Sequence, residues 1–203
     1  MSYKLIYFDI GGRGEPIRMI FAAAGVEFID DRIKDEDWPK IKSAMPWEQI
    51  PVLEIDNDTL AQTVTICRYL GRKFNLVGHT EFHAAKCDEY VDHFNDFFEY
   101  WARYFYEEDE ALKVKYKEEF LAVHLPNCLS KFNSLLEKKK HKDFLVCQEL
   151  TWADVFIATK MDRMQKTTGQ EVLDSYDAVK KFKDTVFNFP KIQEYLKHHT
   201  VNI

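Results

Sequence analysis

The chain has 203 residues, of which 46% are hydrophobic and 31% are charged, a balance typical of globular proteins that fold in water. A formal net charge of −6 argues against nucleic acid as the main partner. No apolar run approaches the roughly 18 residues of a membrane span, and the N-terminus has no signal-peptide pattern. We therefore expect a cytoplasmic protein that binds neither nucleic acid nor membrane.

The cysteine and histidine pattern predicts no disulfide frame and no metal site. The four cysteines are scattered and contain no C-x-x-C pair, which favours reduced thiols and argues against a thioredoxin-type redox enzyme. His79, His83 and Cys87 follow one another at intervals of four residues. Because His79 adjoins Gly78 in a predicted linker, a coherent face of helical ligands is not expected there.

The chain begins with strand and helix signals in alternation. The apolar, aromatic-rich run YKLIYF (3–8) predicts a buried strand. After the breaker GGRG, residues 15–24 predict a helix, because Pro16 occupies its first turn and Gly25 follows its end. VEFIDDRI (26–33) predicts a second strand, and strand–helix–strand order implies a right-handed parallel crossover.

A hairpin and a further helix complete this part of the chain. IPVLEI (50–55) and TLAQ (59–62) flank Asn57-Asp58, which predicts an antiparallel hairpin with a tight turn. A helix is expected from there to about residue 74. This order of elements is a thioredoxin-like plan, so we predict an α/β domain over residues 1–78.

Helix signals dominate residues 79–203. Apolar residues at alternating intervals of four and three predict one long helix with a single seam, formed by Cys87, Val91, Phe94, Phe98, Trp101 and Phe105. Phe120 and Val123 predict the apolar face of the next helix. In LTWAD (150–154), the Thr151 hydroxyl and the Asp154 carboxylate are spaced to satisfy free backbone donors at a helix start. We expect an all-α second domain over residues 79–203.

Tyr7 and Arg13 are the first candidates for chemistry. A tyrosine at the end of a strand is commonly a core residue. Its phenol is alternatively a hydrogen-bond donor to a bound thiolate, which lowers the pKa of a thiol by favouring the anion. Arg13 follows in the GGRG loop and adds positive charge at the same point.

Three further positions allow either a structural or a binding interpretation. Trp38 and Lys42 are consistent with packing and solvation, or with an indole N–H and an ammonium that hold a carboxylate. Pro51 is consistent with an ordinary trans strand start, or with a cis bond that turns the backbone of Ile50 toward a peptide-like ligand.

The pair Gln62-Thr63 precedes a predicted helix. Thr63 is a suitable N-cap, a role worth about 1 kcal/mol. Alternatively, the free N–H groups and the positive dipole end of the helix bind a carboxylate, with the Thr63 hydroxyl and the Gln62 amide as additional contacts. Both interpretations rest on the same helix start, and the pair alone does not separate them.

Four stretches together carry a resemblance to a known family: YFDIGGRGEPIRMIFAAAG, DWPKIKSAMPWEQIPVLEID, LAQTVTICRYLGRKF and LTWADVFIA. In order and spacing they resemble the sigma class of cytosolic glutathione transferases, which includes the haematopoietic prostaglandin D synthases. The resemblance covers nearly the whole chain. It implies the glutathione transferase fold, with glutathione as cosubstrate and no metal.

The resemblance also implies a role for each matching residue. Tyr7 matches the catalytic tyrosine that stabilises the glutathione thiolate, and Arg13 matches the arginine beside it. Asp96 matches an acidic residue that reaches the ligand of a neighbouring subunit, which implies a homodimer. The remaining matches contact glutathione: Trp38 and Lys42 at its glycine carboxylate, Gln49 and Ile50 beside them ahead of a cis Pro51, and Gln62 and Thr63 at its γ-glutamyl end.

The implied reaction is attack by the bound thiolate on a small hydrophobic electrophile, for which the enzyme lowers the thiol pKa and fixes the approach. The electrophile site is expected between the domains, bounded by Phe8, Ile10, Arg13, Tyr100 and Tyr104. The alternatives are a glutathione-dependent prostaglandin D isomerase and a non-enzymatic carrier or structural relative.

Three residues depart from the pattern of the family. Thr63 replaces a serine and places a methyl group beside the expected ligand carboxylate. Asn95 replaces an acidic residue that in prostaglandin D synthases lies where a divalent metal acts, which weakens any metal requirement. Cys147 replaces a glycine before the LTWAD cap, at an expected cost in backbone freedom.

Overall fold

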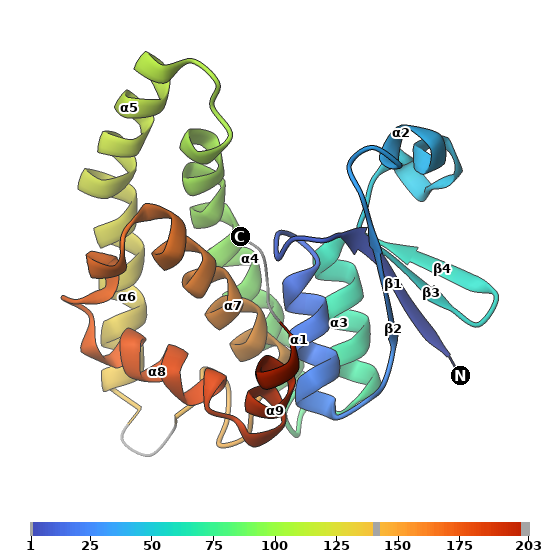
Figure 1. The fold of residues 1–203 in the computed structure, drawn as a ribbon. Coiled ribbons are helices and arrows are strands. Elements are labelled where there is room, and N and C mark those ends of the chain that lie inside the picture. Colours follow the sequence, from blue (N-terminus) through green and yellow to red (C-terminus); the bar gives the residue numbers. More distant parts are fainter. Residues whose placement is uncertain (1, 140–142, 200–203) are drawn as a thin grey trace.

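The structure is a computed structural model that describes residues 2–139 and 143–199 (Figure 1). The first part contains, in chain order, β1 (Tyr3–Phe8), α1 (Glu15–Ala24), β2 (Ile29–Ile33), α2 (Trp38–Ile41), two short 3-10 turns (Lys42–Ala44 and Pro46–Glu48), β3 (Val52–Ile55), β4 (Asp58–Ala61) and α3 (Thr63–Lys73). The second part contains α4 (Glu81–Phe105), α5 (Glu110–Glu119), a π-helical turn (Phe120–His124), α6 (Leu125–Glu137), α7 (Trp152–Thr168), a 3-10 turn (Gln170–Leu173), α8 (Asp177–Phe187) and α9 (Pro190–His198).

The strand–helix–strand unit forms as predicted. β1 and β2 pair in parallel, with Tyr7 opposite Arg32. α1 has Pro16 in its first turn and ends at Gly25, whose left-handed backbone (φ 70°) returns hydrogen bonds to the last turn of the helix. A side chain at Gly25 would strain this turn, which explains why the helix ends at a glycine.

The hairpin forms as predicted, but its turn lies one residue earlier. Ile55 pairs with Asp58, so Asp56 and Asn57 make the turn and Asp58 already belongs to β4. Asp56 has a φ of 51°, a conformation that aspartate tolerates better than most residues. Its carboxylate also accepts the Ser2 N–H at 2.8 Å. In the described residues the strands form one mixed sheet of order β2-β1-β3-β4, which confirms the thioredoxin-like plan.

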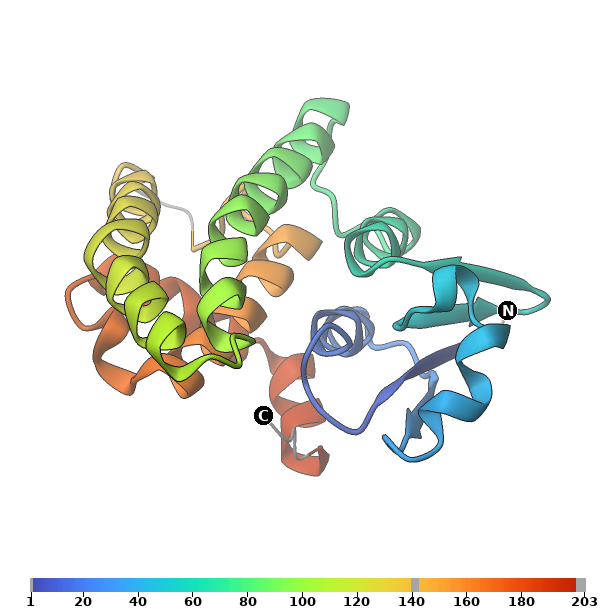
Figure 2. The same cartoon turned by 90° about the horizontal axis from the view of Figure 1, so that it is seen from above.

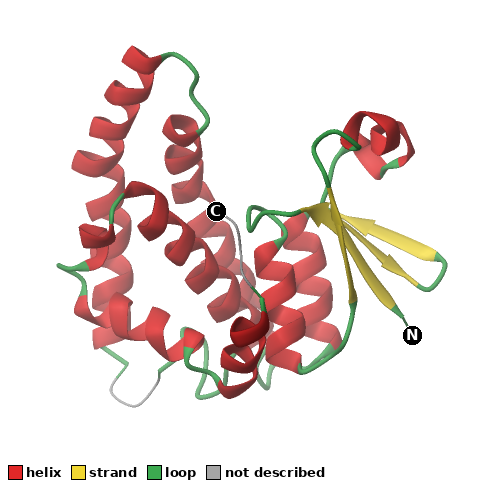
Figure 3. Cartoon of the chain, in the orientation of Figure 1, coloured by secondary structure: helices red, strands yellow, loops and turns green. Residues whose placement is uncertain are grey.

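Helices α1 and α3 lie between the sheet and the helical part of the chain (Figures 1 and 2). α7 packs against both of them. The contact is close at Gly71 of α3, where an added Cβ would overlap the ring of the fully buried Trp152. Among the described residues, strands occur only in the first part (Figure 3). The predicted domain boundary after residue 78 falls in the segment that joins α3 to α4.

The long helix α4 has the predicted seam, from Cys87 to Trp101, and Phe97 and Tyr104 are buried beside it. The prediction for Val123 is wrong, because this side chain is 46% exposed. The π-helical turn at Phe120–His124 inserts an extra residue into the helical repeat. The apolar face therefore passes from Phe120 to Leu125 and continues through α6.

The start of α7 is held by a buried carboxylate. Asp154 accepts hydrogen bonds from the Leu145 N–H at 2.6 Å, the Thr151 N–H at 2.7 Å and the Thr151 hydroxyl at 2.6 Å. Burial raises the pKa of Asp154 to about 6, while these three donors act in the opposite direction. The predicted capping pair is thus confirmed. Cys147 precedes it and is buried, and it is not among the described residues with positive φ, so its Cβ causes no backbone strain.

No helix within the described ranges is long and apolar enough to cross a membrane.

Candidate active site

Tyr7 lies at the end of β1, with only 6% of its surface exposed. Its hydroxyl oxygen accepts the Arg13 backbone N–H at 2.9 Å. Because a phenol has one proton to donate and can also accept, this bond orients the oxygen and leaves its proton for another acceptor. Burial raises the pKa of Tyr7 above its ordinary value, opposed by the Arg13 N–H. The phenol is therefore kept in its protonated, donating form.

Glycines in the loop after β1 allow the backbone to wrap closely around this ring. A Cβ at Gly12, whose φ is 45°, would lie 2.5 Å from the Tyr7 hydroxyl. A Cβ at Gly14 would lie 2.5 Å from the ring itself. Only glycine brings the backbone this close, so GGRG positions Tyr7 as well as ending the strand.

The start of α3 is open. Gln62 occupies the N-cap with φ 74° and ψ 117°, and its side chain does not cap the helix. Thr63 is the first helical residue, so the alternative that Thr63 is the N-cap is wrong. The first intrahelical bond runs from the Ile66 N–H to the Gln62 carbonyl at 2.9 Å. The N–H groups of residues 63–65 precede it and have no partner within the helix.

Two of the predicted residues between β2 and α3, Trp38 and Gln49, contact side chains at these two points. The Trp38 ring meets the Phe8 ring edge-on at 5.8 Å, and Phe8 in turn meets Tyr7 at 5.7 Å. The Gln62 amide nitrogen approaches the Gln49 amide oxygen at 3.5 Å. Lys42 is exposed. The Ile50–Pro51 peptide bond is cis, as the second interpretation of that pair predicted.

A cleft of about 400 Å³ lies where the two parts of the chain meet. Arg13, Gln62 and Thr63 line one side of it, with Val64 and Thr65. The other side is formed by α4, by Tyr106 directly after it, and by α7; the lining residues are Asn95, Phe98, Glu99, Ala102, Tyr106, Phe156, Lys160 and Arg163. The structure thus joins three of the predicted residues to a wall that is both aromatic and cationic.

Three polar residues on the α4 and α7 side of the cleft were not predicted from the sequence. Arg163 donates to the Tyr106 hydroxyl at 3.1 Å, and Lys160 is 6% exposed. Lys160 interrupts the apolar run VFIATKM, and a lysine inside a buried helix is rare enough to have marked the position. Tyr106 had no comparable signal, because it follows the end of α4.

Four further predicted residues are not among those that line the cleft. Asp96 is exposed on α4, and its neighbour Asn95 lines the cleft instead. Tyr100 is 43% exposed and stacks on His124. Tyr104 is 4% exposed and its hydroxyl bonds to Thr168, because the helical repeat turns it toward the core with Trp101. Ile10 is 37% exposed in the loop after β1.

Across residues 2–139 and 143–199, no group of three or more His, Cys, Asp or Glu side chains is arranged to hold a metal ion. In the pattern noted above, the His83 ring accepts the His79 N–H at 3.1 Å, and Cys87 is buried in the core.

Known proteins share this arrangement. Residues 3–72 match the family described as Glutathione S-transferase, N-terminal domain, and residues 95–199 match the corresponding C-terminal domain. Glutathione S-transferase 1 of Ascaris suum is 38% identical, over 96% of this chain and 95% of its own. The hematopoietic prostaglandin D synthase of Rattus norvegicus is 38% identical, over 76% and 75%. The structure of prostaglandin synthase D of Nilaparvata lugens has a TM-score of 0.92 at 36% identity, over 99% and 100% of the two chains.

A four-stranded thioredoxin-like sheet domain followed by an all-helical domain is the fold of the glutathione S-transferases. The chain belongs to the glutathione S-transferase family, and within it the chain is similar to sigma-class members and to hematopoietic prostaglandin D synthases.

Proposed function

We propose that the protein binds glutathione in this cleft and activates its thiol through Tyr7. The observation that carries the proposal is the Tyr7 hydroxyl, which accepts the Arg13 N–H and has a proton left to donate. A hydrogen bond from this proton to sulfur favours the thiolate and lowers the thiol pKa. The Arg13 side chain, on the same cleft, adds positive charge that favours the same anion.

In this proposal, separate groups of residues hold the γ-glutamyl end and the glycine end of glutathione. The open start of α3 offers N–H groups and a positive dipole end to the γ-glutamyl carboxylate, with the Gln62 amide and the Thr63 hydroxyl beside it. Trp38 and Lys42 take the glycine carboxylate. Gln49, Ile50 and the cis Pro51 lie between these ends and pair with the peptide backbone of the ligand.

In the proposed reaction, the sulfur of the thiolate forms a bond to an electrophilic carbon, and the leaving group departs with the electron pair of the broken bond. The thiol proton is released to solvent before the attack. The chain positions the two reactants and stabilises the anion, and no cysteine of the protein takes part. Phe8, Ile10 and Arg13 bound the electrophile on the side of β1.

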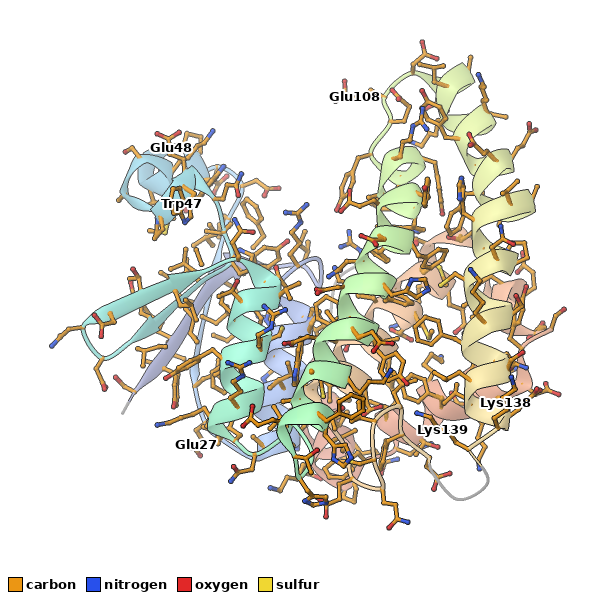
Figure 4. The ribbon with its side chains drawn as sticks, turned by 180° about the vertical axis from the view of Figure 1, so that it is seen from behind. Glu27, Trp47, Glu48, Glu108, Lys138 and Lys139 are labelled. Atoms are coloured by element: carbon orange, nitrogen blue, oxygen red, sulfur yellow. The ribbon has the colours of Figure 1, made fainter. Side chains whose placement is uncertain are left out.

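We also propose a homodimer. Asp96 is exposed on α4, and in the proposed dimer it reaches the ligand held by the second copy. Two large apolar side chains support the proposal, because Trp47, in the turn between α2 and β3 (Figure 4), is 79% exposed and Phe82 is 72% exposed. Light scattering of the protein at micromolar concentration measures its molar mass. A mass equal to that of one chain would contradict the proposed homodimer.

A conjugation assay tests the proposed function. The wild type should conjugate glutathione to 1-chloro-2,4-dinitrobenzene, and Tyr7→Phe should lose about 10- to 100-fold in kcat, the worth of one hydrogen bond to an anion. A wild type that is retained on immobilised glutathione but shows no conjugation would instead indicate a carrier.

Prostaglandin D isomerisation is the second candidate activity, favoured by the similarity to proteins named for it. Incubation with prostaglandin H₂ and glutathione, followed by product identification, tests it separately. Formation of no product above the spontaneous background would remove this candidate and leave the conjugation proposal intact.

A further inference from the structure

We infer that Lys160 and Arg163 form an anion-binding subsite in the cleft, which selects hydrophobic electrophiles that carry a carboxylate. The inference rests on the proposed function and specifies the class of its second substrate. Both side chains come from α7 and line the same cleft as Arg13, Gln62 and Thr63.

Lys160 is a buried cation that makes no direct ion pair with the carboxylates of the described residues. Its side chain is 6% exposed, and its ammonium lies 4.6 Å from the centre of the Phe98 ring and 5.7 Å from that of Phe156. Within the described parts of the chain, no carboxylate pairs with it and no hydrogen bond is made by its ammonium. A buried charge is costly unless it is paired, so this position favours the arrival of an anion.

Arg163, one turn further along α7, is a second cation, and its hydrogen-bond donors are only partly used. Its guanidinium lies over the Trp101 and Phe105 rings, at 5.1 and 5.4 Å from their centres. One of its terminal nitrogens donates to Tyr106. Its Nε is buried and has no partner among the described residues. The aromatic rings and Tyr106 hold the guanidinium in place and leave part of its donor capacity unused.

Charges of both signs surround Lys160, and Glu15, Asp162 and Lys166 share a second cavity with it. Arg163 on α7 and Arg13 after β1 are like charges. Glu99 on α4 and the buried Cys67 thiol on α3 act in the opposite direction. Burial, followed by the two arginines, lowers the pKa of Lys160 to about 7. The ammonium is therefore partly protonated near neutral pH, and a bound anion stabilises the protonated form.

The rest of this wall indicates what carries the anion. Phe98, Ala102 and Phe156 line the same side of the cleft as the two cations. They suit an apolar or aromatic body whose carboxylate reaches α7. The γ-glutamyl carboxylate of glutathione has its own donors across the cleft, at the start of α3, which leaves Lys160 and Arg163 for the second substrate.

A matched pair of ligands tests the subsite without requiring turnover. The glutathione conjugates of 4-chloro-3,5-dinitrobenzoate and of 4-chloro-3,5-dinitrobenzamide differ in one group, which is an anionic carboxylate in the first and a neutral carboxamide of similar size in the second. Their dissociation constants are measured by calorimetry for the wild type, for Lys160→Met and for Arg163→Gln. Lys166→Met is the control, since Lys166 lies on the same helix but is exposed and paired with Asp162.

We expect the wild type to bind the carboxylate conjugate about tenfold more tightly than the amide at pH 6.5, as one charged hydrogen bond predicts. Lys160→Met should lose most of this preference, Arg163→Gln part of it, and Lys166→Met none. The preference of the wild type should fall as the pH rises through about 7, because the ammonium loses its proton, and it should be independent of pH in Lys160→Met.

Equal affinity of the wild type for the two conjugates would overturn the inference, and so would a preference that survives in Lys160→Met. Weaker binding of glutathione itself by Lys160→Met, with the preference unchanged, would assign the lysine to glutathione and also overturn it. Turnover of the two parent chlorides is a separate readout. A protein that prefers the carboxylate conjugate but catalyses no conjugation supports the subsite and contradicts only the proposed function.

Discussion

The N-terminal ends of α3 and α7 differ in how their backbone N–H groups are capped. At α7, the Asp154 carboxylate is fully buried and accepts three hydrogen bonds from the preceding segment. At α3, Gln62 is exposed, its φ is 74°, and no side chain caps the helix. The free backbone donors of a helix start need an acceptor in both places. At α7 the chain itself supplies acceptors, since the Trp152 N–H bonds to the Leu76 carbonyl at 2.8 Å and Thr151 and Asp154 form a capping box. At α3, under the proposed function, a ligand supplies them.

This difference separates folding from binding. The Asp154 hydrogen bonds fix the segment from Leu145 to Thr151 onto α7, the helix that packs against α1 and α3. The start of α3 lacks the stabilisation of a side-chain cap. It also holds Gln62 in a backbone conformation that in general costs about 1–3 kcal/mol. Substitutions at α7 should therefore change stability, whereas substitutions at α3 should change affinity.

The largest effect on stability is expected at the capped start of α7. Asp154→Ala should lower the free energy of unfolding by about 3 kcal/mol, because two buried N–H groups and a hydroxyl lose their acceptor. The control is Asp109→Ala, which removes an exposed cap at α5 and should cost about 1 kcal/mol. Denaturant titration measures both. Equal losses in the two variants would remove the distinction between a buried and an exposed cap.

An intermediate effect is expected at Thr63. Thr63→Val keeps the shape and removes the hydroxyl, so the dissociation constant of glutathione should rise about tenfold, as loss of one hydrogen bond to a carboxylate predicts. Thr63→Ser should bind as well as the wild type or slightly better. Unfolding midpoints should barely move in either variant. An unchanged dissociation constant in Thr63→Val would reduce Thr63 to an ordinary helical residue.

The smallest effect is expected at Gln62. Glycine adopts positive φ without strain, so Gln62→Gly should stabilise the protein by about 0.5–1 kcal/mol after its own entropic cost is subtracted. Glutathione should bind more weakly, because the amide is lost. Gln62→Ala should show the weaker binding without the gain in stability. A loss of stability in Gln62→Gly would mean that the side chain supports the helix start after all.

Local patterns predicted the scaffold well. The parallel unit around α1, the seam of α4 and the Thr151–Asp154 pair follow from spacing alone, since each depends on residues within a few turns of one another. The hairpin turn and the apolar face at Val123 were misplaced, because a one-residue change in register or a π-helical turn leaves no clear mark in composition. The cationic wall at Lys160 was missed because α4, α7 and the loop after β1 meet only in the folded chain.

The central claim, that Tyr7 stabilises the thiolate of bound glutathione, is tested most directly by titrating that thiol. The ultraviolet absorption of the thiolate in the binary complex, followed against pH, gives its pKa. The wild type should hold this pKa well below that of free glutathione, and Tyr7→Phe should return it toward the free value by about 1–2 units, the worth of one hydrogen bond to an anion. A bound thiol with the same pKa in the two proteins would contradict the account.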